Sequence, residues 1–296
     1  MLNVADINTS VCRTYKIQML LLRFQICNLH TSFMIKISVV IITLNEERNI
    51  ARCLESVRKV ADEIVVIDSA STDRTADIAK QYGARVIIQP FLGYVEQHNF
   101  ANKQASNDWL LVLDADEALS EQLEKSILAV KKQPTHNAYK FARLTNYCGT
   151  WIKHSGWYPD KKIRLIDRRT GSWAGHKVHE YWQQEQGSLG ELKGDLLHYS
   201  FYTISQHIKQ TEKFSELWAL AAAENGKDCS ILKVWLAPKW SFFSNYVLKL
   251  GFLDGYAGYL VCKYTALYTM IKYAKLRQYA RWLHEGKDFE GKPKSV

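Results

Sequence analysis

Two aspartates separated by one residue follow a strongly apolar run and form the clearest chemical motif in the chain. Asp114 and Asp116 come directly after the run from 108 to 114, whose centre reads Leu-Leu-Val-Leu. Carboxylates at positions i and i+2 after a buried strand can share a divalent cation, which substrate phosphates then complete. Because aspartate is also common in turns, a purely structural role stays open. The pair predicts a Mg²⁺ or Mn²⁺ site that neutralises charge on a departing diphosphate.

Polar residues also follow two earlier apolar runs. Thr43, Asn45 and Glu46 end the first run, and Asp68 ends the second. In open α/β sheets, ligands bind beyond the carboxyl ends of the strands, so neighbouring strands would bring these residues into one cleft with the aspartate pair. Asp68 is then placed to accept hydrogen bonds from uracil N3 or a ribose hydroxyl. Residues 71 to 73 are interpreted as turn and helix-cap residues, and Asn45 fits either a cap or a ligand contact.

The first half of the chain alternates short β-branched runs with helical segments, which is typical of parallel βαβ units. Each run is nearly continuous in Val, Ile and Leu, as expected where helices cover both faces of a sheet. Cap residues fall near the predicted helix boundaries. The predicted strands are 35–44, 63–69, 85–89 and 108–114, and the predicted helices are 46–59, 74–82, 95–105 and 120–133.

The second half has a different pattern. Residues 138–200 contain short strands, many aromatics and several glycines, which favours a mixed or antiparallel half of the same domain. Helical patterns then cover 205–225 and 240–282. We therefore expect an α/β catalytic domain over 35–200 and a basic, aromatic helical region over 201–296.

The first 34 residues are predicted to be a leader outside the fold. Their apolar run, 17–22, is interrupted by Arg23 and is too short to span a membrane. Met34 directly precedes the first strong strand and is the expected start of translation. A translated but flexible leader is the alternative.

The positive charge of the chain, +9, is concentrated near its C-terminus. Residues 227–296 hold 12 Lys and Arg against 5 Asp and Glu. Charged residues interrupt every possible apolar span there, whereas basic aromatic helices suit the plane of an anionic membrane surface. Packing against the enzyme's own core is the alternative. No nucleic-acid motif accompanies the charge. The six cysteines lack C-x-x-C spacing and are interpreted as reduced cytosolic thiols.

Three motifs taken together give a family resemblance. The runs 38–47 (SVVIITLNEE), 63–73 (EIVVIDSASTD) and 114–117 (DADE) resemble the inverting family 2 glycosyltransferases of GT-A fold. In the second half, 156–160 (GWYPD), 162–165, 178–180, 251–255 (GFLDG) and 272–275 resemble the lipopolysaccharide-core branch of WaaE/KdtX type. The resemblance covers about residues 35–285. It implies transfer of β-glucose from UDP-glucose to an inner-core heptose.

The resemblance also assigns roles at individual positions. It implies that Asp68 binds uridine, that Asp114 binds the ribose or metal-bound water, and that Asp116 binds the Mg²⁺ or Mn²⁺ bridging the diphosphate. Two positions depart from the family. Leu44 stands where many relatives have a base-stacking Tyr, and His98 stands where Lys or Arg is expected near the diphosphate, so its charge would depend on pH.

An inverting transfer needs a base that takes the proton from the acceptor hydroxyl. Glu180 and Asp160 are the two candidates, and Glu180 is preferred because it follows a Gly-rich, aromatic segment. The basic cluster 161, 162, 164, 168 and 169 is either a solvated face or a binding site for acceptor phosphate and carboxylate groups.

The predicted function is therefore a metal-dependent hexosyltransferase, located in the cytoplasm and peripheral on the inner face of the cytoplasmic membrane. Its predicted partners are a UDP-sugar, a lipid A-core heptose and the anionic membrane surface, with no nucleic acid. Two alternatives remain at this point. One is transfer to a polyprenyl phosphate or another envelope glycan, and the other is a non-catalytic protein that binds sugar nucleotides at a membrane surface.

Overall fold

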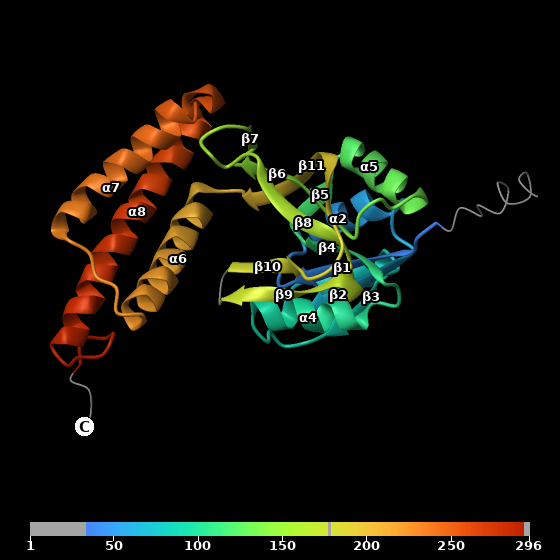
Figure 1. Ribbon diagram of the computed structural model, residues 1–296, viewed down its shortest axis with the longest axis horizontal. Coiled ribbons are helices and arrows are strands. Elements are labelled where there is room, and N and C mark those ends of the chain that lie inside the picture. The colour runs from blue at the N-terminus through green and yellow to red at the C-terminus, as the bar shows by residue number, and fades with distance from the viewer. Residues whose placement is uncertain (1–33, 177–178, 293–296) are drawn as a thin grey trace, which may run out of the picture.

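The computed structural model describes residues 34–176 and 179–292. The predicted leader therefore lies outside the described residues, apart from Met34. Figure 1 shows a sheet domain beside a separate layer of long C-terminal helices. The predicted combination of an α/β domain with a helical C-terminal region is confirmed.

The four predicted N-terminal strands form one parallel half of a sheet. They are β1 (Ile37–Thr43), β2 (Glu63–Asp68), β3 (Arg85–Ile88) and β4 (Trp109–Asp114), arranged as β3-β2-β1-β4. Because β1 lies between β2 and β4, Thr43 pairs with Asp68 and Ile42 pairs with Asp114. The three polar strand ends therefore meet at one edge, as the sequence predicted.

The second half of the sheet is mixed, also as predicted. β8 (Asp160–Asp167) runs antiparallel to β4 and to β6 (Ala138–Tyr147), and β11 (Leu189–Phe201) is parallel to β6. β5 (Glu117–Leu119) and β7 (Thr150–Ile152) complete this sheet, while β9 (Gly171–His176) and β10 (His179–Gln184) form a separate hairpin.

Alternate residues of β1 pack into two different cores. Ile37, Val39 and Ile41 point to the face covered by α2 (Ile50–Val57), α3 (Thr75–Gln81) and α5 (Glu121–Lys132). Val40 points to the other face, under α4 (Tyr94–Gln104) and the β9–β10 hairpin. A strand covered on both faces needs apolar residues at every position, which explains its continuous Val and Ile run.

Helix α2 begins at Ile50, so the predicted start at position 46 is wrong. Asn45 has a left-handed backbone (φ 55°), which prevents the helix from starting there. The amide of Glu46 donates to Thr75 Oγ1 (2.8 Å), and the amide of Glu47 donates to Asp73 (3.1 Å). These long-range bonds hold the segment in a turn that extends the polar edge of the sheet.

Three long helices follow the sheet. α6 (Ile204–Glu224) begins with a capping box between Thr203 and Gln206. α8 (Gly255–His284) packs against α6 through a shared apolar cluster that includes Leu276 and Tyr279. The helical stretch predicted over 240–282 is helical in the structure, with an interruption that the sequence did not indicate. Before α8 the chain forms α7 (Ile231–Phe243) and the short helices η2 (Ser244–Leu248) and η3 (Gly251–Asp254), with Leu250 in a left-handed turn (φ 56°).

Candidate active site

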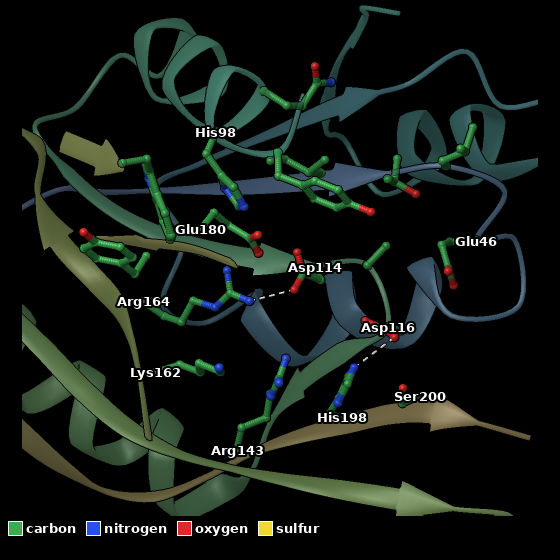
Figure 2. Close-up of a pocket in the computed structure, with 18 of the residues that line it drawn as sticks. Glu46, His98, Asp114, Asp116, Arg143, Lys162, Arg164, Glu180, His198 and Ser200 are labelled. Atoms are coloured by element: carbon green, nitrogen blue, oxygen red, sulfur yellow. Dashed lines mark hydrogen bonds and ion pairs between the residues drawn. The ribbon is translucent and has the colours of Figure 1, made fainter. Parts of the chain in front are cut away.

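A cavity of about 970 Å³ opens at the carboxyl ends of β1 and β4. The second half of the sheet, the β9–β10 hairpin and α6 supply its remaining walls, and Figure 2 shows its charged side chains converging. Among the predicted site residues, those that line the cavity are Thr43, Glu46, His98, Asp114, Asp116 and Glu180. Asn45, Asp68 and Asp160 do not line it.

Asp114 is held by a buried arginine from a strand far along the chain. Arg164 Nη2 lies 2.6 Å from the Asp114 carboxylate, and the two residues are 50 positions apart. Despite burial, the Arg164 guanidinium lowers the pKa of Asp114 to about 2. Asp114 is therefore ionised at physiological pH, and its second oxygen can accept a hydrogen bond from a ligand hydroxyl or from metal-bound water.

Glu117 is the buried partner that fixes this arrangement. One of its carboxylate oxygens accepts from the Asp114 amide (3.0 Å), while the other lies 3.4 Å from both Arg143 and Arg164. Burial raises the pKa of Glu117. The guanidinium groups of Arg143 and Arg164 thus face the carboxylates of Asp114 and Glu117. These ion pairs hold the turn that carries the aspartate pair in place.

Asp116 lies against a histidine that the sequence motifs did not identify. His198 Nε2, on β11, is 3.2 Å from the Asp116 carboxylate, and their side chains are only 14% and 22% exposed. Carboxylate oxygen and imidazole nitrogen are both accepted ligands of Mn²⁺-type cations. The pair fits a divalent cation that takes its remaining ligands from water and the substrate diphosphate. No group of three or more His, Cys, Asp or Glu ligands occurs among the described residues.

Residues at the carboxyl ends of β1 and β2 form hydrogen bonds that join the two strand-end loops. The Asp68 carboxylate is buried and accepts hydrogen bonds from the Ser71 amide and hydroxyl. Asn45 Oδ1 accepts from the Thr72 amide at 2.8 Å, joining the two strand-end loops. Thr43 Oγ1, by contrast, is buried without a hydrogen-bond partner within the described part of the chain. Binding of uridine by Asp68 and Asn45 stays a prediction, since it would need their present bonds to be shared.

His98 on α4 stacks on Trp173, with ring centroids 4.1 Å apart (Figure 2 shows His98 above Asp114). Burial lowers the pKa of His98 to about 4. The imidazole is consequently neutral at pH 7, so cations on the second half of the sheet supply the positive charge beside the aspartate pair. Those cations are Arg143, Lys162 and Arg164.

The two candidate bases lie in different surroundings. Asp160 is bound by Arg143 (2.7 Å) and Lys162 (3.2 Å), and its pKa is lowered despite burial, mainly by Arg143. Glu180, on β10, lines the cavity, and among the described residues no hydrogen bond or ion pair engages its carboxylate. Because Glu180 faces the cavity and Asp160 does not, the geometry favours Glu180 as the base.

The basic cluster separates into two groups. Arg164 is buried at the cavity, and Lys161 and Lys162 line it. Arg168 and Arg169 instead pair with Asp108 and Asp167 outside it. Lys162 and Arg164 are two residues apart on one strand, and this spacing in the sequence indicates that both side chains point to the same face. His198 and Arg143 had no local signal of this kind.

Glu46, which lines the cavity, has a raised carboxylate pKa. Burial, together with the charges of Asp116, Asp73 and Asp114, raises its pKa to about 7. A raised carboxylate pKa means that the folded state binds the extra proton, so this group destabilises the fold as pH rises from about 4.5 to 7.

We expect Glu46→Gln to be more stable than the native chain at pH 8, by about 1–2 kcal/mol after allowing for solvent screening. The advantage should fade toward pH 5, where the native carboxyl is already protonated. Urea unfolding at both pH values measures it. An advantage equal at both values would show that ionisation of Glu46 is not its cause.

Comparison with known proteins gives consistent matches over most of the chain. Residues 38–192 match the family model described as glycosyl transferase family 2. An uncharacterized glycosyltransferase of Rickettsia typhi is 34% identical over 254 residues, covering 82% of this chain and 87% of the relative. A protein of Rhizobium meliloti named lipopolysaccharide core biosynthesis glycosyltransferase LpsC is 31% identical over 252 residues, covering 82% and 92%.

Solved structures resemble the chain over a smaller part. Glucosyl-3-phosphoglycerate synthase from Mycobacterium tuberculosis, in complex with Mn²⁺, UDP and glucosyl-3-phosphoglycerate, aligns with a TM-score of 0.32 and 24% identity. The alignment covers 38% of this chain and 44% of that one, so the matched part is less than half of either chain.

Proposed function

The chain belongs to glycosyl transferase family 2, and from this premise we propose that it transfers glucose from UDP-glucose, with inversion, onto an inner-core heptose of lipopolysaccharide. The GT-A fold predicted from the motifs is confirmed by the family match together with the sheet order. The named function of the Rhizobium relative, lipopolysaccharide core biosynthesis, supports the acceptor class. The WaaE/KdtX-type motifs support the donor and the heptose.

The observation that carries this proposal is that Asp114 and Asp116 share one cavity with several cationic side chains. Arg164 pairs with Asp114, Arg143 pairs with the neighbouring Glu117, and Lys162 lies on the same wall. A nucleotide diphosphate presents negative charge that such cations and a carboxylate-bound metal neutralise together. A bound Mg²⁺ or Mn²⁺, held by Asp116 with His198 or Asp114, would supply Lewis-acid stabilisation of the departing UDP.

The proposed transfer is a single displacement at the anomeric carbon of the donor sugar. The acceptor oxygen forms a bond to the anomeric carbon while the bond from that carbon to the diphosphate oxygen breaks, which inverts the configuration. Glu180 takes the proton of the acceptor hydroxyl, and Asp160 is the alternative base. Arg143 and Lys162 both pair with the Asp160 carboxylate, which favours Glu180 over Asp160 as the base.

Replacing Glu180 by Gln is expected to lower kcat about 100-fold because proton transfer is lost while side-chain size is kept. The matched variant Asp160→Asn should lower kcat less than Glu180→Gln does. Steady-state release of UDP in the presence of acceptor measures both. A larger loss in the Asp160 variant would reassign the base.

Incubation of the purified chain with UDP-glucose, Mn²⁺ and either of two acceptors tests the function. We expect glucose on a heptose-terminated core and none on a polyprenyl phosphate. Product on the polyprenyl phosphate alone would identify the alternative envelope glycosyltransferase. UDP binding without turnover on any acceptor would identify a non-catalytic sugar-nucleotide-binding protein. Loss of one hexose from the lipooligosaccharide of a strain lacking the gene is the expected cellular result.

The C-terminal region supports the proposed location at the inner face of the cytoplasmic membrane. None of the helices among residues 34–176 and 179–292 is both long enough and apolar enough to span a bilayer. Exposed apolar side chains are most concentrated on α7, η2 and η3, whereas α8, which packs against α6, exposes fewer of them along a longer helix. The segment between Asp228 and Asp254 has no acidic residue and contains Lys233, Lys239 and Lys249. The exposed apolar side chains there are Ile231, Leu232, Trp235, Leu236, Trp240, Phe243, Val247, Leu248, Leu250, Phe252 and Leu253.

The paired substitution Trp235→Ser and Trp240→Ser should lower binding to vesicles containing phosphatidylglycerol by at least about tenfold. Each indole is more than 60% exposed, at 65% and 62%, and would lose about 1.5–3 kcal/mol of burial in the interface. Vesicle sedimentation measures the change. Tyr82→Ser, which removes a 41% exposed ring outside this surface, is the matched control. Equal binding of both variants would contradict insertion of α7.

A further inference from the structure

A second cavity of about 570 Å³ adjoins the first. The two share one wall segment, made by Arg143, His198, Ser200, Gln210 and Phe214. A ligand in the second cavity can therefore reach the space beside Asp116 without crossing the protein core. The second cavity is also bounded by α8, which belongs to the helical layer of Figure 1.

One face of α6 forms much of the second cavity. His207, Gln210, Thr211, Phe214 and Trp218 follow the spacing of a single helical stripe, and all five line the space. Such a stripe normally closes on a packed core. Here part of the stripe lines a cavity, which lies between the sheet and the C-terminal helices.

The lining combines aromatic rings with neutral polar groups. Trp157 and Tyr268 lie on the walls contributed by the β7–β8 loop and α8. Among the described residues, neither the Gln210 amide nor the Tyr268 hydroxyl has a hydrogen-bond partner. Rings beside unpaired neutral donors and acceptors suit a ligand that has both C–H faces and hydroxyl groups.

The basic side chains around the second cavity already have partners within the protein. Arg143 pairs with Asp160 (2.7 Å), the His198 ring contacts Asp116 (3.2 Å), and Lys272 lies over the Trp218 and Tyr268 rings (4.8 and 4.9 Å). Burial lowers the pKa of His207 to about 4, which leaves that imidazole uncharged at pH 7. Lys161, Lys162 and Lys213 line only the first cavity. This distribution favours neutral sugar rings in the second cavity and phosphate groups in the first.

We propose that the second cavity binds the acceptor glycan, with sugar rings against Trp157, Trp218 and Tyr268 and the attacking hydroxyl projecting past Gln210 into the first cavity. The inference rests on the proposed glycosyltransferase function and names the binding site of its acceptor. It also assigns the C-terminal helices a role in acceptor recognition, because α6 and α8 supply three of the five Phe, Trp and Tyr rings of this wall, namely Phe214, Trp218 and Tyr268.

Calorimetric titration of the full chain, saturated with UDP and Mn²⁺, tests the site. The probe is deacylated core oligosaccharide from a strain lacking this gene, which removes any contribution from membrane binding. We expect Tyr268→Ala, which removes a wall, and Thr265→Trp, which fills the space, each to weaken oligosaccharide binding about tenfold or more. The matched control is Tyr256→Ala on the same helix, whose ring is 73% exposed outside both cavities. It should bind oligosaccharide like the native chain.

Affinity for UDP, measured on the same samples, separates the possible failures. All three variants should bind UDP with native affinity, which also shows that they are folded. Native oligosaccharide affinity in both cavity variants would overturn the proposal and move the acceptor elsewhere. A native chain that binds no UDP would overturn the proposed function itself.

Discussion

Replacement of Asp116 by Asn is expected to lower kcat/KM at least about 1,000-fold, a loss of about 4 kcal/mol in transition-state stabilisation. The amide keeps the size of the side chain but removes the negative charge that holds a divalent cation beside the diphosphate. Because His198 lies 3.2 Å from this carboxylate, the variant also loses the partner that orients the imidazole. UDP release with saturating Mn²⁺ measures the effect, and calorimetry should show that Mn²⁺ no longer strengthens UDP binding.

Asp77→Asn is the matched control for this prediction. Asp77 lies on α3 with a side chain that is 71% exposed, and its contact with Lys80 is 4.0 Å, so activity should stay within about twofold of native. A fully active Asp116 variant would remove the metal from the proposed mechanism. Native activity in a metal-free chelated sample would lead to the same conclusion by an independent route.

Replacement of Arg164 by Leu is expected to destabilise the fold by about 3–5 kcal/mol. The guanidinium is only 6% exposed and lies between Asp114 (2.6 Å) and Glu117 (3.4 Å), so its removal leaves the fully buried Glu117 carboxylate facing the partly exposed carboxylate of Asp114. Urea unfolding at pH 7 measures the loss. Activity should fall as well, because the turn that carries Asp116 depends on the same network.

The effect of Arg164 has a defined pH dependence. The folded pKa of Asp114 is about 2, below its ordinary value of 3.8, so its ionised pairing stabilises the fold above about pH 4 and is lost as pH falls toward 2. The stability difference between Arg164→Leu and the native chain should therefore shrink in that interval. Arg281→Leu is the control, since that side chain is 78% exposed and its partner Glu285 is on the surface, so the substitution should leave the free energy of unfolding almost unchanged. Equal destabilisation by both variants would contradict the buried network.

The residues behind these two predictions differ in how much local signal they carry. An acidic pair after an apolar strand is a local pattern, so the sequence alone singles out Asp116. Arg164 belongs to a basic cluster that has two open interpretations at the level of sequence. Arg164 is buried beside Asp114 because β8, which carries it, pairs antiparallel with β4 and β6.

The helices and strands that depend on residues close together in the chain could be predicted from the sequence. Periodicity and apolar runs predicted β1 to β4 and the α3, α4, α5 and α6 helices to within a few residues. The prediction was wrong where distant side chains set the backbone. Thr75 and Asp73 hold the segment before α2 in a turn, so the helix begins at Ile50 and not at position 46.

The sequence by itself determined the α/β class, the aspartate pair, the polar strand ends and the basic C-terminal region, since each depends on residues close together in the chain. Only the tertiary structure decided which groups surround Asp114 and Asp116. Arg143, Arg164 and His198 arrive from β6, β8 and β11, and α6 closes a second cavity beside them. The physical reason is that charge pairing and burial act through space, so residues without any shared local pattern complete the site around the pair.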